Sequence, residues 1–167
     1  MGQVFRARHR IMDRDVAIKV IKRQFMNDET TLRRFENEIK AAARLQHPNI
    51  VSSFDAEVEN NANLLVMEYV DGKKMSDLVS LKKRLSIRHA CHFARQVAQG
   101  LQHALEQGLI HRDIKPDNIF LIERKGDPYF VKVLDFGIAR AEFAGREAVT
   151  ASVRYGSLRY LAPERRL

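Results

Sequence analysis

The hydrophobic pattern of this chain changes its period near residue 70, and that change limits the fold more than any other feature. Up to Tyr69 apolar residues follow strand patterns, except in residues 28–45, where they recur every three or four positions. Beyond Asp71-Gly72 the helical spacing dominates. We therefore expect an α+β protein of two lobes, a small β-rich lobe with one helix and a mainly helical lobe, joined by a hinge near residues 68–72.

The expected elements follow this pattern. Strands are predicted at residues 4–8, 16–22, 50–58, 64–69, 119–122 and 130–134. The helix of the first lobe should end near His47-Pro48, because a residue before proline is disfavoured in a helix. A long helix should begin after Ser86 as N-cap and end at Gly108. Its apolar face is predicted to carry Ile87, Ala90, Phe93, Val97, Leu101 and Leu105.

The composition is that of a globular protein. Of the 167 residues, 45% are apolar and 30% are charged, and charges break every apolar run well short of a membrane span. The net charge of +8 is spread along the sequence without interleaved aromatic residues, so nucleic acid is not an expected partner. Cys91 is the only cysteine, and its apolar neighbours predict a buried thiol. With no secretory signal at the start, a cytoplasmic location is expected.

Two polar motifs carry the chemistry. The first, His111-Arg112-Asp113-Ile114-Lys115-Pro116-Asp117-Asn118, places a carboxylate, a cation and a carboxamide at fixed offsets on one short loop. The second, Asp135-Phe136-Gly137, adds a carboxylate at a sharp turn. Phosphoryl transfer needs a carboxylate that accepts a hydroxyl proton, a cation that screens the phosphate, and oxygen ligands for Mg²⁺. The two motifs together supply all of these groups.

These motifs resemble those of the protein kinases, and in particular the bacterial eukaryotic-like (Hanks-type) serine/threonine kinases. Three further segments support the resemblance: Val16-Ala17-Ile18-Lys19, Met67-Glu68-Tyr69-Val70 and Ala162-Pro163-Glu164. Of the glycine-rich phosphate loop, only Gly2 and Val4 match. We therefore expect a bilobal kinase fold truncated at both ends. Residues 1–70 would be an N-lobe lacking its first strand and part of the glycine-rich loop, and residues 71–167 a C-lobe that extends to the Ala-Pro-Glu motif.

The resemblance also implies a role for each matching residue. The catalytic residues would be Asp113 as the base, Lys115 as the cation beside the phosphate, Asn118, Lys19 and Glu38. Glu38 would hold Lys19 in place, and Glu36 is the competing candidate for that role. ATP would contact Gly2, Val4, Ala17, Lys19, Met67, Glu68, Val70, Phe120 and Asp135. Mg²⁺ would be held by Asn118 and Asp135.

The implied activity is transfer of the γ-phosphate of ATP to serine or threonine hydroxyls of protein substrates, with autophosphorylation at Thr150 or Ser152. Two alternatives stay open. A non-catalytic remnant or interaction module would keep the motif residues without the full scaffold. A small-molecule phosphotransferase shares a similar base loop, but Lys115-Pro116 and the Ala-Pro-Glu motif count against it.

Overall fold

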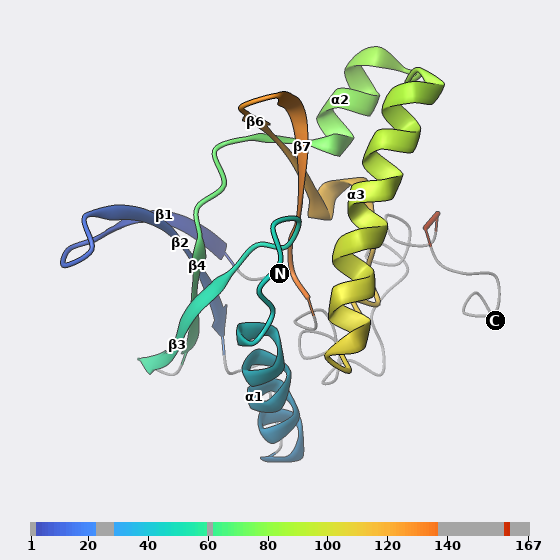
Figure 1. Ribbon diagram of the computed structural model, residues 1–167. Helices are drawn as coiled ribbons and strands as arrows, with labels where there is room; N and C mark the ends of the chain where they lie inside the picture. The colour runs from blue at the N-terminus through green and yellow to red at the C-terminus, as the bar shows by residue number, and fades with distance from the viewer. Residues whose placement is uncertain (1–2, 23–28, 60–61, 137–158, 161–167) are drawn as a thin grey trace.

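Two antiparallel sheets, each with its own helical partner, organise the chain (Figure 1). The structure is a computed structural model that describes residues 3–22, 29–59, 62–136 and 159–160. The first sheet has the strand order β1-β2-β4-β3. Its strands are β1 (Gln3–His9), β2 (Arg14–Lys22), β3 (Ser53–Glu59) and β4 (Ala62–Glu68), and its helix is α1 (Glu29–Ala43), which contacts β3.

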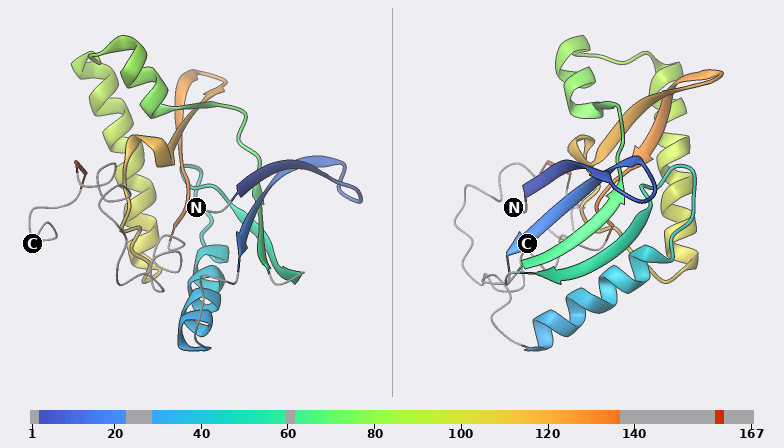
Figure 2. Two further views of the ribbon diagram at one scale, coloured as in Figure 1. Left: turned by 180° about the vertical axis from the view of Figure 1, so that it is seen from behind. Right: turned by 90° about the vertical axis from the view of Figure 1, so that its left-hand side faces the viewer.

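The second lobe combines a small sheet with two helices. The sheet has the order β5-β6-β7, formed by β5 (Lys73–Lys74), β6 (Ile119–Arg124) and β7 (Asp127–Val133). The short helix α2 (Met75–Lys82) contacts β5 and β6, and the long helix α3 (Ile87–Glu106) packs along β7 (Figures 1 and 2). This arrangement confirms the expected bilobal α+β fold.

The register of the first sheet brings the expected nucleotide-site residues together. On β2, Lys19 lies opposite Val4 of β1 and Leu65 of β4, and Ala17 lies opposite Met67. Ala17 and Lys19 are two positions apart, so their side chains share one face of the sheet, and both are buried. The strand pairing therefore sets Lys19 beside the buried surface formed by Ala17 and Met67.

Helix α3 has the predicted ends, and the middle of its predicted apolar face, Phe93, Val97 and Leu101, packs in the hydrophobic core. The Ser86 hydroxyl accepts the His89 N–H at 3.3 Å, and Gly108, at φ 76°, follows the helix. The buried stripe consists of Phe93, Gln96, Gly100 and Ala104.

The prediction was wrong for the ends of the apolar face: Ile87, Ala90 and Leu105 are exposed, as is Cys91, which was predicted to be buried. The stripe is rotated because the groups that α3 covers on β7 include polar backbone atoms, which Gln96 contacts.

Two hydrophobic clusters form the core, and one of them joins the lobes. The first cluster belongs to the N-lobe and contains Ala17, Ile21, Ile39, Val51, Leu65 and Met67. The second contains C-lobe residues such as Phe93 and Val131, but also Ala42, Leu45 and Ile50 from the end of α1 and the link that follows it. The end of α1 is therefore packed into the C-lobe.

Gly72 marks the C-lobe end of the expected hinge. A Cβ atom at this position would lie 2.6 Å from the Leu121 carbonyl oxygen and 2.7 Å from a methyl group of Ile122. Any larger residue at position 72 would therefore push β6 away from the chain segment that leads from the first lobe into β5. No helix among the described residues is both long and apolar enough to cross a membrane.

Candidate active site

The loop between α3 and β6 brings together three of the five predicted catalytic residues, with Lys115 and Asn118 bonded to the carboxylate of Asp113. Asp113 Oδ2 accepts from Lys115 Nζ at 2.7 Å and from Asn118 Nδ2 at 3.1 Å. Asn118 Nδ2 also donates to the Asp113 carbonyl at 2.8 Å, and the turn Pro116–Asn118 is a 3₁₀ helix. These contacts fix the orientation of Asp113 and hold a cation beside it. The spacing Asp-x-Lys-x-x-Asn thus produces the predicted cluster.

His111 connects this loop to the second motif. Its ring is 3% exposed, its Nδ1 accepts the Asp113 N–H at 3.3 Å, and its Nε2 lies 2.7 Å from the Leu134 carbonyl. A carbonyl only accepts, so Nε2 carries the proton and the ring is neutral. Burial lowers the pKa of His111, against the opposing effects of the Leu134 carbonyl and of Asp135 and Asp113. The ring also meets Phe136 edge-on, with centroids 4.6 Å apart.

The second carboxylate lies next to the buried lysine of β2. Asp135 Oδ2 is 3.2 Å from Lys19 Nζ, and the Lys19 side chain is 8% exposed. Asp135 adopts a φ of 60°, in the left-handed region that aspartate tolerates better than most residues. The preceding Leu134 N–H donates to the Asn118 carbonyl at 2.9 Å. Asp135 and Asn118 are thus tied to each other through the backbone.

The predicted Lys19–Glu38 pair is not tested. Glu38 lies in α1, but its side chain is outside the described part of the structure, as is that of Phe35. The competing Glu36 is half-buried on the same helix. Other predicted residues that lie outside the described ranges are Gly2, Gly137, Thr150, Ser152 and the Ala162-Pro163-Glu164 motif.

The donor set of Asn118 and Asp135 suits Mg²⁺. Because Asn118 uses Nδ2 to bond Asp113, its oxygen Oδ1 is the end of the amide that remains for a cation. Within the described residues, no group of three or more His, Cys, Asp or Glu side chains is placed to hold a metal. Mg²⁺ needs no such cage, since one or two protein oxygens with phosphate and water complete its shell. The two residues therefore fit a metal that arrives with a nucleotide.

The predicted adenine site is partly formed by buried surface. Ala17 and Met67 are buried, Phe120 and Val70 are half-buried, and Val4 is 60% exposed. The backbone N–H of Glu68 donates to the Ser52 carbonyl at 2.9 Å, so only its carbonyl remains for a base edge.

A small cavity is lined by Met67 together with Ala42, Leu65, Asp135 and Phe136. Its lining includes Met67 and Asp135 of the predicted nucleotide site but neither Ala17 nor Phe120.

One polar contact near the hinge was missed from the sequence. Lys132 of β7 bonds the Glu68 carboxylate at 2.8 Å, and the same carboxylate accepts the Ser52 N–H at 3.2 Å. Glu68 was predicted to contact ATP, and its ion pair with Lys132 was not predicted. The only signal for Lys132 in the sequence is its place between buried Val131 and Val133, which puts it on the opposite face of the strand.

Comparison with known proteins shows the family of this chain. The protein kinase domain family matches residues 1–165. The chain is 40% identical to the serine/threonine-protein kinase pkn3 of Myxococcus xanthus, over 98% of this chain and 31% of that protein. It is also 40% identical to PrkC of Bacillus subtilis, over 98% of this chain and 24% of that protein. With PknA of Mycobacterium tuberculosis the identity is again 40%, over 100% and 39% respectively.

Solved structures show the same fold. The Mycobacterium tuberculosis PknI kinase domain aligns with a TM-score of 0.72 and 30% identity, covering 83% of this chain and 55% of that one. Rad53 residues 1–466 in complex with AMP-PNP aligns with a TM-score of 0.71 and 28% identity, covering 82% and 35%. The chain spans less than two-fifths of the length of the curated relatives named above. It belongs to the protein kinase family, and its named curated relatives are bacterial serine/threonine kinases.

Proposed function

We propose that this chain carries the catalytic centre of a serine/threonine protein kinase that transfers the γ-phosphate of ATP to hydroxyls of protein substrates. The observation that supports this best is the cluster of Asp113, Lys115 and Asn118 on one loop, with Asp135 and Lys19 paired beside it. The loop and its neighbours thereby bring together a candidate base, a cation and two candidate metal ligands, which are the groups that phosphoryl transfer requires. The names of the bacterial relatives support the same activity.

Each residue has a role that follows from its surroundings. Asp113 accepts the proton of the substrate hydroxyl, and its bonds to Lys115 and Asn118 hold the carboxylate in one orientation. Lys115 neutralises charge on the transferred phosphoryl group, and Lys19 positions the phosphates from the β2 side. Asn118 and Asp135 would hold Mg²⁺, which supplies charge neutralisation on the phosphate oxygens.

The nucleotide base would lie against Ala17, with Val4 and Phe120 on either side and Met67 at its inner end. The Glu68 carbonyl and the backbone of Val70 would pair with the adenine edge. Glu38 would hold Lys19 for the α- and β-phosphates. Thr150 and Ser152 are the proposed sites of autophosphorylation, and the protein is proposed to act in the cytoplasm.

The test is transfer of labelled phosphate from ATP in the presence of Mg²⁺, to the chain itself and to a generic basic protein. We expect label in the parent and none in Asp113→Asn or Asp135→Asn, because the first removes the base and the second removes the negative charge of a metal ligand. Arg88→Gln, an exposed change on α3, is the control and should label like the parent. A folded parent that takes up and transfers no label would contradict the proposal and favour the non-catalytic alternative.

A further inference from the structure

Strand β7 is an outer strand of its sheet, so one row of its backbone groups has no neighbouring strand within that sheet. The row belongs to Tyr129, Val131 and Val133, and the two valines have no exposed surface. A buried N–H or carbonyl without a partner is strongly unfavourable. The partners of these groups therefore determine how β7 is held in place.

The segment that follows α1, residues 44–52, supplies the hydrogen-bond partners of Val133. The Val133 N–H donates to the Asn49 carbonyl at 2.8 Å, and the Val133 carbonyl accepts the Val51 N–H at 2.9 Å. These bonds form a single parallel bridge between Ile50 and Val133. The bridge involves only Val133 of β7, and the backbone groups of Val131 and Tyr129 are bonded by side chains instead of by a strand.

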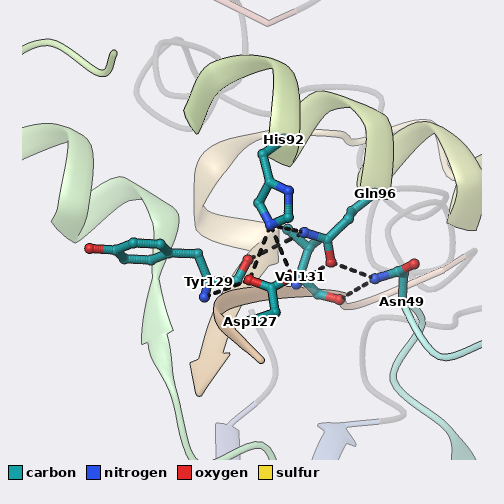
Figure 3. A network of polar contacts seen from close by, with 6 residues as sticks. All are labelled: Asn49, His92, Gln96, Asp127, Tyr129 and Val131. Atoms are coloured by element: carbon teal, nitrogen blue, oxygen red, sulfur yellow. Dashed lines mark hydrogen bonds and ion pairs between the residues drawn. The ribbon is translucent and has the colours of Figure 1, made fainter. Parts of the chain in front are cut away.

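The side-chain amide of Gln96 replaces that strand. Its Oε1 accepts the Val131 N–H at 2.9 Å and Asn49 Nδ2 at 3.0 Å, and its Nε2 donates to the Tyr129 carbonyl at 3.3 Å (Figure 3). Asn49 Nδ2 also donates to the Val131 carbonyl at 2.9 Å. Gln96 is 3% exposed in the middle of α3. One amide thus joins α3, the link after α1 and β7.

The outer end of the row is held close by. The Tyr129 N–H donates to Asp127 Oδ1 at 2.9 Å, and Asp127 Oδ2 lies 2.9 Å from His92 Nε2. Gln96 Nε2 is 2.8 Å from the same ring nitrogen (Figure 3). All six outward groups of Tyr129, Val131 and Val133 therefore have partners, and Gln96 supplies two of them directly.

This edge leads directly to the proposed metal site. Val133 lies two positions before Asp135, and the single intervening residue, Leu134, bonds the Asn118 carbonyl through its N–H and His111 through its carbonyl. A displacement of β7 along its axis would thus move Asp135 relative to Asn118. We propose that Gln96 is a positioning residue for Mg²⁺-dependent nucleotide binding, acting by fixing β7. This inference rests on the proposed kinase function.

The test compares Gln96→Met with Gln99→Met. The change is the same, both residues lie on α3, and Gln99 is exposed. ATP affinity is measured by calorimetry with and without Mg²⁺, and amide hydrogen exchange is measured by NMR. For Gln96→Met we expect the gain in affinity from Mg²⁺ to fall by about ten-fold, as for other residues that orient metal ligands. The Mg²⁺-free affinity should be unchanged, and exchange should rise selectively at Val131, Val133 and Leu134.

A conservative variant guards against a folding failure. Gln96→Glu keeps an acceptor for the Val131 N–H and Asn49 but loses the donor to Tyr129, so its effects should have the same direction and a smaller size. Equal Mg²⁺-dependent affinity in Gln96→Met and Gln99→Met would overturn the positioning role. So would a rise in exchange that extends evenly to β2 and β4, because that indicates general destabilisation.

The two proposals fail separately. If the parent binds no ATP at all, the kinase function fails. The exchange data then decide alone, and unchanged protection of Val133 and Leu134 in Gln96→Met overturns the positioning role.

Discussion

Asp135 combines two demands at one residue: a backbone conformation that most side chains avoid and a carboxylate beside a buried lysine. Its φ is 60° and its Oδ2 lies 3.2 Å from Lys19 Nζ. Asparagine tolerates the left-handed region nearly as well as aspartate, whereas alanine is penalised there by about 1 kcal/mol. We therefore expect Asp135→Ala to be less stable than Asp135→Asn by about 1 kcal/mol in urea unfolding.

The same pair separates conformation from charge. Both variants lose the negative charge of the carboxylate next to Lys19, which is also the proposed charged ligand for Mg²⁺, so neither should show Mg²⁺-dependent ATP binding. The asparagine variant should nevertheless keep the parent's backbone, as seen in the NMR shifts of Leu134 and Phe136. Equal unfolding midpoints for the two variants would refute the role assigned to the backbone conformation.

His111 makes the stability of the site depend on pH. Its folded-state pKa is lowered, chiefly by burial, below the ordinary value of 6.5. The unfolded chain therefore takes up a proton at a pH where the folded chain does not. The contribution is fully present above pH 6.5 and is lost as pH falls through that value toward the lowered pKa. We expect the free energy of unfolding, measured in urea at several pH values, to decrease in this window.

Replacing the histidine should flatten this dependence. His111→Gln is expected to be less stable than the parent at neutral pH, because it loses a buried ring, but to depend less on pH below 6.5. Burial also lowers the pKa of His47, with additional effects of His103 and Lys132, so His47→Gln serves as the comparison. Its ring is more exposed, and its removal should flatten the curve less. A parent curve that is level between pH 7 and pH 5 would contradict the assignment.

At the scale of elements, the strands β4 and β7 are joined by an ion pair beside the hinge. Lys132 Nζ lies 2.8 Å from the Glu68 carboxylate, with the two side chains 12% and 28% exposed. Lys132→Met would leave the half-buried Glu68 carboxylate without this cation, while the Ser52 N–H, at 3.2 Å, would still donate to it. We expect a loss of about 1–3 kcal/mol in the free energy of unfolding.

A double-mutant cycle with Glu68→Gln isolates the pair. The lysine change should cost less in the Glu68→Gln background than in the parent, because the carboxylate left without its cation is no longer there. Lys125→Met, an exposed change on the same β-hairpin, is the control and should be nearly neutral. If Lys132→Met and Lys125→Met have equal effects, the ion pair does not stabilise the junction.

The elements also show how far sequence patterns reach. Hydrophobic period, the Ser86 cap and Gly108 were sufficient to place α3 and the main strands to within a few residues. They gave the middle of the buried face of α3 but not Gln96, because a period reports which residues are apolar and not which polar groups a neighbouring strand presents. Gln96 is buried because β7 needs an acceptor and a donor at that place. The two-residue strand β5 is too short to produce a periodic signal.

The contacts of the candidate site differ in how far the sequence could predict them. Asp113, Lys115 and Asn118 act within one loop, so their spacing in the sequence is enough to bring them together. Lys19 and Asp135 come from different lobes, and their contact depends on how α1 and the link after it pack against β7. Lys132 and Gln96 carry no motif, since any residue that supplied the same bonds would serve. Sequence reasoning therefore found the groups that are proposed to do the chemistry and missed Lys132 and Gln96, which hold neighbouring elements in place.

At the scale of the whole molecule, the end of α1 connects the two lobes more firmly than the hinge alone. Leu45 is 2% exposed and belongs to the C-lobe cluster with Ile50, Phe93 and Val133. Leu45 therefore stabilises the packing of one lobe on the other, and we expect the two lobes to unfold in one transition. We expect Leu45→Ala to cost about 2–5 kcal/mol and to increase amide exchange equally in β4 and in α3.

Ile21→Val provides the matched measurement in the other lobe. Ile21 is also 2% exposed, but it lies in the cluster of the first sheet, with Val51 and Leu65. If the shared core makes the chain one cooperative unit, Ile21→Val should lower the free energy of unfolding by about 0.5–1.5 kcal/mol. The free energy of opening derived from amide exchange should then fall by the same amount in α3 as in β4. Two separate midpoints, with β4 opening while α3 stays protected, would mean that the lobes are coupled only through the hinge.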